Sequence, residues 1–156
     1  MKKIKVIVAS DNHFDHDILK SIERDNPDGD YFLHLGDSLL NNELLRPFQS
    51  VLGNNDFDMS LPRDRVIKIA NHKIFMTHGH RYLGPGLNNL IQHAKDEGCD
   101  ICLYGHTHRY QITYDKDILA LNPGSCWYDR YGGKPSYAIL YLYENGEIEV
   151  NKVDID

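Results

Sequence analysis

Short apolar segments alternate with polar turns along the whole chain of 156 residues. Residues 4–9 form a nearly continuous run of Val and Ile, which is typical of a strand buried on both faces. Similar runs predict short strands at 31–35, 50–52 and 101–104. Each of these strands is followed by Gly, Asp, Asn or His, so the pattern indicates strands that end at polar loops.

Helices are predicted where apolar side chains recur at the helical spacing. Residues 14–25 and 85–97 show this pattern, and residues 39–48 predict a third, shorter helix. The remaining periodic segments alternate in pairs and predict antiparallel hairpins. The hairpins are expected at 65–77, 110–121 and 137–153, the last with a turn at Asn145-Gly146.

The first half of the chain therefore alternates strands with helices, whereas the second half consists mostly of hairpins. This order predicts an α/β fold, built either on one mixed sheet or on a sandwich of two sheets with helices outside. We interpret residues 1–156 as a single domain, because no linker, charge block or repeat divides them.

The composition argues against nucleic-acid-binding, membrane and secreted proteins. Asp and Glu number 23 against 17 Lys and Arg, a net charge of −6 that disfavours binding to bulk nucleic acid or anionic membranes. Three cysteines cannot pair evenly, and no apolar run is long enough for a signal sequence or a membrane span. We therefore expect a cytoplasmic protein without membrane association. Nine histidines are many for this length.

Five polar clusters carry the candidate chemistry, and each begins just after an apolar run. In chain order they are Ser10-Asp11-Asn12-His13, Gly36-Asp37, Gly53-Asn54-Asn55-Asp56, Thr77-His78-Gly79-His80 and Gly105-His106-Thr107-His108. Ligands of open α/β sheets bind at the carboxyl ends of the strands. If these strands are parallel neighbours, the five clusters converge on one crevice.

The clusters supply seven candidate metal ligands of the carboxylate, amide and imidazole types. They are Asp11, His13, Asp37, Asn54, His78, His106 and His108. Seven ligands are too many for one tetrahedral ion but suit two ions about 3.5–4 Å apart that share a carboxylate. With no thiolate in the set, manganese is the first choice, and nickel, zinc, iron and magnesium are alternatives.

Two divalent ions with two carboxylates leave a surplus of about two positive charges, which favours a compact anionic substrate. Paired metals also convert bound water to hydroxide and clamp the oxygens of an in-line displacement. Hydrolysis of a small phosphoester by metal-bound hydroxide is therefore the predicted reaction.

The order of these motifs resembles that of the calcineurin-like metallophosphoesterase superfamily. The segment Asn122-Pro123-Gly124-Ser125, followed by Arg130 and Pro135-Ser136-Tyr137, is similar to the small single-domain phosphodiesterases of bacteria and archaea. The resemblance implies a four-layer α-β-β-α sandwich of two mixed sheets, with the metal site at the C-terminal edge of the strands. It also implies how the ligands divide. One ion would be held by Asp11, His13 and His108, the other by Asn54, His78 and His106, with Asp37 bridging the two.

The chain departs from the family pattern at Asn55, where many members carry a histidine that assists the leaving group. Asparagine cannot donate a proton under working conditions. We therefore expect protonation to be weak or to come from His80 or water, and activity to favour esters with good leaving groups. Asp37, Asn54, Asn55 and His80 are the predicted catalytic residues. Asn55, His80 and Arg130 are the predicted substrate contacts, with structural support for His80 and a solvated loop position for Arg130 as alternatives.

The leading prediction is thus a dinuclear, metal-dependent phosphodiesterase. Two alternatives stay open: a phosphomonoesterase, and a non-catalytic interaction scaffold similar to the small subunit of retromer. The tyrosines at 137, 141 and 143 would serve sheet packing or a contact between identical subunits. His34 is expected either in the core or in support of the ligands, Asp56 in orienting its neighbours, and residues 122–125 in a turn or a phosphate contact.

Overall fold

The computed structural model describes residues 2–156 and contains, within that range, ten strands in two five-stranded sheets. The first sheet has the order β10-β9-β1-β2-β3 and the second the order β4-β5-β6-β8-β7. The first sheet comprises β1 (Lys3–Ala9), β2 (Tyr31–His34), β3 (Gln49–Ser50), β9 (Ser136–Tyr143) and β10 (Ile148–Asp154). The second comprises β4 (Asp64–Ile69), β5 (His72–Thr77), β6 (Ile101–Leu103), β7 (Tyr110–Asp115) and β8 (Ile118–Pro123).

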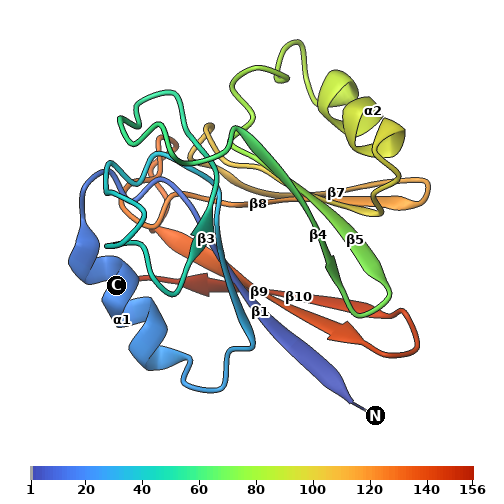
Figure 1. Ribbon diagram of the computed structural model, residues 1–156, viewed down its shortest axis with the longest axis horizontal. Helices are drawn as coiled ribbons and strands as arrows, with labels where there is room; N and C mark the ends of the chain where they lie inside the picture. Colours follow the sequence, from blue (N-terminus) through green and yellow to red (C-terminus); the bar gives the residue numbers. More distant parts are fainter. Residues whose placement is uncertain (1) are drawn as a thin grey trace.

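The two sheets and two helices form four layers, as predicted. Figure 1 shows α1 (His16–Asp25) and α2 (Asn88–Asp96) on opposite outer sides of the paired sheets. Apolar side chains such as Val8 and Leu103 fill the space between the sheets. Leu19 of α1 packs on the outer face of the first sheet, and Leu90 of α2 packs on that of the second. No helix in residues 2–156 is long and apolar enough to cross a membrane.

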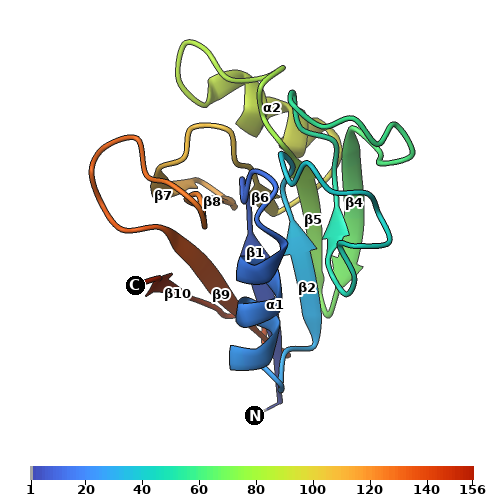
Figure 2. The same ribbon diagram turned by 90° about the vertical axis from the view of Figure 1, so that its left-hand side faces the viewer.

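Parallel pairing determines where the polar clusters lie. In the first sheet β1 pairs in parallel with β2, and β2 with β3; in the second sheet β5 pairs in parallel with β6. The five clusters follow these five strands, so their loops emerge from the same end of the molecule (Figure 2). The predicted condition for convergence, parallel neighbours, is therefore met, but by two sheets rather than one.

The predicted helix over 39–48 was wrong. These residues form turns, because Leu39 has a left-handed φ of 56° and its N–H is bound by the Asp56 carboxylate at 2.9 Å. The N–H of Asn42 is likewise held by Asp58 at 2.8 Å. A left-handed residue cannot belong to a right-handed helix, and the two carboxylates hold the segment in turns.

Both other helices begin later than predicted. Asp15 caps α1 by accepting the N–H of Ile18 at 3.1 Å, so that helix starts at His16. Helix α2 starts at Asn88 because Gly84 and Gly86 both adopt positive φ, which a right-handed helix excludes. The hairpins lie where they were predicted, each within two residues.

The layer between the sheets offers a direct test of what holds the two halves together. Leu103 is fully buried there, so Leu103→Ala should lower the free energy of unfolding by about 2–5 kcal/mol. Val66→Ala, at a position on β4 that is 40% exposed, is the matched control and should change it by less than about 0.5 kcal/mol. Urea unfolding followed by circular dichroism measures both. Equal losses would show that packing between the sheets does not dominate.

Candidate metal centre

The carboxylate of Asp11 lies where the loops of the two sheets meet. Asp11 follows β1 and is fully buried. Its Oδ2 accepts hydrogen bonds from the Ser10 hydroxyl at 2.5 Å and from the backbone N–H of His106 at 3.2 Å. Its Oδ1 is equally buried but has no hydrogen-bond partner among the described residues. A buried, unpartnered carboxylate oxygen is costly unless a cation neutralises it.

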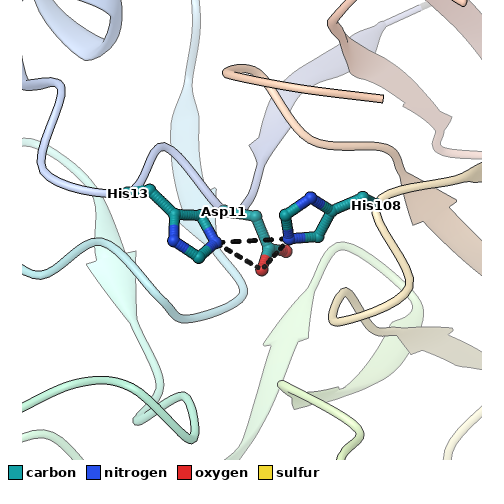
Figure 3. A group of neighbouring side chains, drawn as sticks. All are labelled: Asp11, His13 and His108. Atoms are coloured by element: carbon teal, nitrogen blue, oxygen red, sulfur yellow. Dashed lines mark hydrogen bonds and ion pairs between the residues drawn. The ribbon is translucent and has the colours of Figure 1, made fainter. Parts of the chain in front are cut away.

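Three imidazole nitrogens surround this free oxygen. The Nε2 atoms of His108, His13 and His78 lie 3.3, 3.7 and 3.8 Å from Asp11 Oδ1, and Figure 3 shows the first two converging on it. Burial by itself would raise the pKa of Asp11, but its contacts with His108 and His13 outweigh burial and hold the pKa below its ordinary value. The carboxylate is therefore ionised and faces three imidazole nitrogens, an arrangement that fits a bound cation.

Asp37 provides the second carboxylate and lies between two of these histidines. Its Oδ2 is 3.3 Å from His78 Nε2 and 3.9 Å from His13 Nε2. The backbone and side-chain amides of Asn55 donate to its two oxygens, each at 2.9 Å. Burial raises the pKa of Asp37, but His78 and Asn55 together lower it by more, so the pKa lies below its ordinary value. Asp37 thus lies within 4 Å of two of the histidines that surround Asp11.

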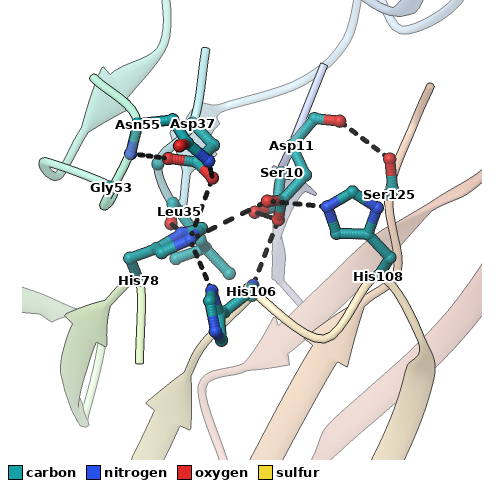
Figure 4. Close-up of polar contacts among 12 residues, drawn as sticks. Ser10, Asp11, Leu35, Asp37, Gly53, Asn55, His78, His106, His108 and Ser125 are labelled. Carbon is teal, nitrogen blue, oxygen red and sulfur yellow. Dashed lines mark hydrogen bonds and ion pairs between the residues drawn. The ribbon is translucent and has the colours of Figure 1, made fainter. Parts of the chain in front are cut away.

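Two histidines have their orientation fixed by backbone carbonyls. His78 Nδ1 donates to the carbonyl of Leu35 at 2.7 Å, and His108 Nδ1 donates to that of Tyr128 at 3.2 Å. Each Nε2 points toward the carboxylates, and in the neutral imidazole it carries the lone pair, which is the usual arrangement of a metal-bound histidine. Figure 4 shows His78 and His108 approaching Asp11 from opposite sides.

His106 joins the same group of donors. Its Nδ1 lies 3.3 Å from His78 Nε2. Burial, and then the neighbouring His78, lower the pKa of His106, so its imidazole tends to be neutral. The structure therefore brings together six of the seven predicted ligands: Asp11, His13, Asp37, His78, His106 and His108. We call these six residues the donor cluster.

The seventh predicted ligand, Asn54, lies at the edge of this group. It is exposed and lines a cleft of about 260 Å³ together with His80, Arg63 and Arg81. The His80 ring is 5.4 Å from the His78 ring, and its buried Nδ1 has no hydrogen-bond partner in the described chain. Burial lowers the pKa of His80. Asn54 and His80 thus face the cleft from beside the donor cluster.

Arg130, the predicted cationic substrate contact, is exposed in the loop after β8. Its positive charge acts on the centre, because it adds to burial and His78 in lowering the pKa of His106. Arg130 is not part of the donor cluster.

The backbone around the donors is unusual. Five of the six cluster residues have left-handed φ values between 42° and 73°: Asp11, His13, Asp37, His106 and His108. Such values are uncommon outside glycine and concentrate at functional sites. A Cβ at Gly53 would collide with the Asp37 carboxylate, and one at Gly105 with the Ser10 hydroxyl. The loops are packed so closely here that only glycine fits.

Asp56 ties two of the loops together. Its Oδ2 accepts the N–H groups of Asp37 at 2.9 Å and Gly53 at 2.7 Å, and its Oδ1 accepts that of Leu39. These contacts match the predicted orienting role. One carboxylate thereby fixes the distance between the Gly36-Asp37 turn and the Gly53-Asn54 turn.

Asn122 and Ser125 position the centre rather than only forming a turn. The Asn122 amide donates to the Gly105 carbonyl at 3.1 Å and to the Thr107 hydroxyl at 3.0 Å. The Ser125 hydroxyl donates to the backbone carbonyl of Asp11 at 2.7 Å. Both residues are buried. Sequence reasoning missed this role, because the partner of Ser125 lies 114 positions earlier in the chain.

His34 supports the first loop from below. Its Nε2 donates to the Asn12 side-chain carbonyl at 2.8 Å, while its Nδ1 accepts the N–H of Gly36 at 3.0 Å. Asn12 stands between Asp11 and His13, so His34 fixes the backbone that carries both donors. Burial lowers the pKa of His34 to about 4. His34 therefore has both predicted roles, because it is buried in the core and supports the ligand loop.

The buried His34 should make stability depend on pH. Because its pKa is lower in the folded protein than the usual 6.5, the unfolded chain binds more protons between these values. The free energy of unfolding should therefore fall as the pH drops from 6.5 to 4, with His34 contributing roughly 3 kcal/mol of the loss. In His34→Gln this part of the slope should disappear. Urea unfolding across the pH range measures it, and an unchanged slope in the variant would contradict the assignment.

The whole sequence compares closely with known phosphoesterases. The family model for the calcineurin-like phosphoesterase superfamily domain matches residues 4–145. The probable metallophosphoesterase YsnB of Bacillus subtilis is 32% identical over 155 residues, covering 97% of this chain and 91% of YsnB. The phosphodiesterase MJ0936 of Methanocaldococcus jannaschii is 27% identical over 148 residues, covering 79% of this chain and 84% of MJ0936.

Solved structures agree with this comparison. A predicted phosphoesterase from Streptococcus pneumoniae TIGR4 superposes with a TM-score of 0.85 at 30% identity, covering 99% of both chains. Vps29 from Entamoeba histolytica, complexed with zinc, has a TM-score of 0.75 at 23% identity, covering 98% of this chain and all of Vps29. That likeness concerns the fold. Together with the family model, these relatives show that the chain belongs to the calcineurin-like phosphoesterase superfamily.

Proposed function

We propose that this protein is a phosphodiesterase that works with two divalent metal ions. The observation that carries the proposal is the buried, unpartnered Oδ1 of Asp11, facing the Nε2 atoms of three histidines. A hydrogen-bonded core would satisfy that oxygen, whereas a cation site needs it free. The name of the relative MJ0936 supports the reaction class.

The donor cluster offers two overlapping sets of ligands. Asp11, His13 and His108 form one compact group, and Asp11, Asp37 and His78 form the other. In our proposal the first set holds one ion, while His78, His106 and Asn54 hold the second and Asp37 bridges both. Bound metals would neutralise the phosphate and supply an activated water. Oxygen and imidazole donors without thiolates favour manganese, with nickel, zinc, iron and magnesium as alternatives.

Protein groups near the metals would handle the leaving group. The Asn55 side chain donates to Asp37 and can hydrogen-bond a phosphate oxygen, but it cannot deliver a proton. His80 lines the cleft, and its imidazole is the candidate for hydrogen bonding to the departing oxygen. Arg130 adds positive charge on the exposed side. This division of roles favours esters whose leaving groups need little protonation.

The surroundings of the centre favour a diester over a monoester. The cleft lined by Asn54 and His80 opens at the His78 end of the donor cluster. At the other end, Trp127 lies exposed beside His13. A cleft at one end and an exposed aromatic ring at the other suit a phosphate that carries two ester limbs. A phosphomonoesterase would use only one side.

A second candidate function is a protein-interaction scaffold, favoured by the fold likeness to Vps29. The exposed side chains of Phe57 and Met59 could contact a partner protein. The intact donor cluster favours the enzyme, because a scaffold has no need for buried charged groups. For either function, three free buried thiols suit a reducing compartment such as the cytoplasm.

Removing and restoring metal tests the enzyme directly. Metal-free protein should hydrolyse neither mono- nor diesters, and Mn²⁺ should restore cleavage of bis(4-nitrophenyl) phosphate best among the ions offered singly. Asp37→Asn removes the bridging charge and should lower kcat/KM by at least about 100-fold. Asp117→Asn, an exposed position, is the control. Calorimetry should count two ions per wild-type chain. If the metal-loaded protein cleaves no ester, and Asp37→Asn changes nothing, the scaffold function is favoured instead.

Substitution at residue 55 tests the leaving-group proposal. Asn55→His introduces an imidazole that can donate a proton, so it should raise kcat for diesters with alkyl leaving groups by about 10-fold or more. For aryl leaving groups the gain should vanish, since they depart without protonation. Rates across a series of leaving groups give the slope in each protein. A wild-type rate that does not depend on leaving-group pKa would overturn the idea.

A further inference from the structure

Exposed aromatic side chains gather at the His13 end of the donor cluster. Trp127, Tyr128 and Tyr131 are each at least half exposed, although large aromatic rings are normally buried. The Trp127 ring lies 4.9 Å from the His13 ring, and the Tyr128 ring lies 6.4 Å from the His108 ring. We call Trp127, Tyr128 and Tyr131 the aromatic rim. It borders the site where the phosphate would bind.

The rim is held in place by the same contacts that hold the donors. The Ser125 hydroxyl oxygen accepts the backbone N–H groups of Trp127 at 3.1 Å and Tyr128 at 2.9 Å, and it donates to Asp11. The carbonyl of Tyr128 accepts Nδ1 of His108. The backbone of Trp127 and Tyr128 is therefore fixed relative to Asp11 and His108. This gives the two rings a defined position beside the phosphate site.

The chemistry of the rim suits a flat, polar ring rather than an aliphatic chain. One side of Trp127 faces His13, and half of the residue stays exposed. The Arg109 guanidinium lies 5.0 Å from the centre of the Tyr131 ring, and Arg130 stands between the rim residues in sequence. Aromatic faces accompanied by arginine bind nucleobases by stacking, with little preference among bases.

We propose that the aromatic rim binds the nucleobase of a small nucleotide ester whose phosphodiester lies at the donor cluster. This rests on the proposed function and names its substrate class. Because Trp127 contacts a metal-ligand candidate, a base attached through one sugar can reach it. The net charge of −6 disfavours a long polyanion, so a nucleotide ester or dinucleotide fits better than a polymer.

Fluorescence tests the rim without catalysis. Trp127 is the single tryptophan of the chain, so the intrinsic tryptophan signal reports on the rim alone. In zinc-loaded protein, adenosine 5′-monophosphate should change this signal saturably, whereas ribose 5-phosphate, which lacks the base, should leave it nearly unchanged. Equal responses to both, or none to either, would contradict the proposal, and the second result would favour a docking surface for protein.

Kinetics separates the rim from the metal centre. The 4-nitrophenyl ester of thymidine 5′-phosphate and methyl 4-nitrophenyl phosphate share a leaving group and differ in the retained limb. Stacking should give the thymidine ester a kcat/KM about tenfold higher, mainly through KM. Trp127→Ala should bring the ratio near one, and Trp127→Phe should keep most of it. Phe57→Ala, an exposed aromatic outside the rim, should leave the ratio as in wild type.

The outcomes distinguish the two proposals. If the protein cleaves both esters at the same kcat/KM, the phosphodiesterase stands and the rim proposal fails. If it cleaves neither, the proposed function fails, and the fluorescence response to the base still decides whether the rim binds nucleotides.

Discussion

The buried carboxylate of Asp11 is the constraint on which the rest of the site depends. A charge taken out of water must be compensated by hydrogen bonds or by opposite charge. Here part of the compensation is local, from Ser10 and His13. The rest comes from His78, His106 and His108, which follow strands of the second sheet. The backbone of Asp11 is tied to Gly36 and Ser125 as well. The same group therefore joins both sheets and creates the demand for a cation.

The backbone conformation of the donor residues costs free energy, and hydrogen bonds within the loops offset part of that cost. Left-handed backbone at five donor positions opposes folding, since each such residue costs on the order of 1–3 kcal/mol. Asp56, Asn122 and His34 hold these turns by binding their N–H and carbonyl groups. A ligand that binds only the folded state adds to stability, so metal binding and folding support each other in this design. In the proposed function, the cleft at one end of the donor cluster and the aromatic rim at the other would select the substrate.

Much of the site could be predicted because each donor stands directly after an apolar strand. Asp11 and Asp37 follow β1 and β2, and His78 follows β5. Parallel pairing brings such positions to one edge within each sheet. Local sequence was less informative for the connections. The segment 39–48 has the apolar spacing of a helix, yet Leu39 adopts a left-handed φ, and Asp56 and Asp58 hold the segment in turns.

By itself, the sequence determined the alternation of strands and helices, the chemical type of the donors and the family, because these depend on spacing along the chain. Only the tertiary structure decided that the donors come from two sheets and that Asn54 faces the cleft. It also decided that Asp11 belongs to both ligand groups, one with His13 and His108 and the other with Asp37 and His78. The positioning role of Ser125 likewise follows only from the structure. The physical reason is distance along the chain. A hydrogen bond between residues 114 positions apart leaves no periodic signal, since it exists only after both sheets have packed.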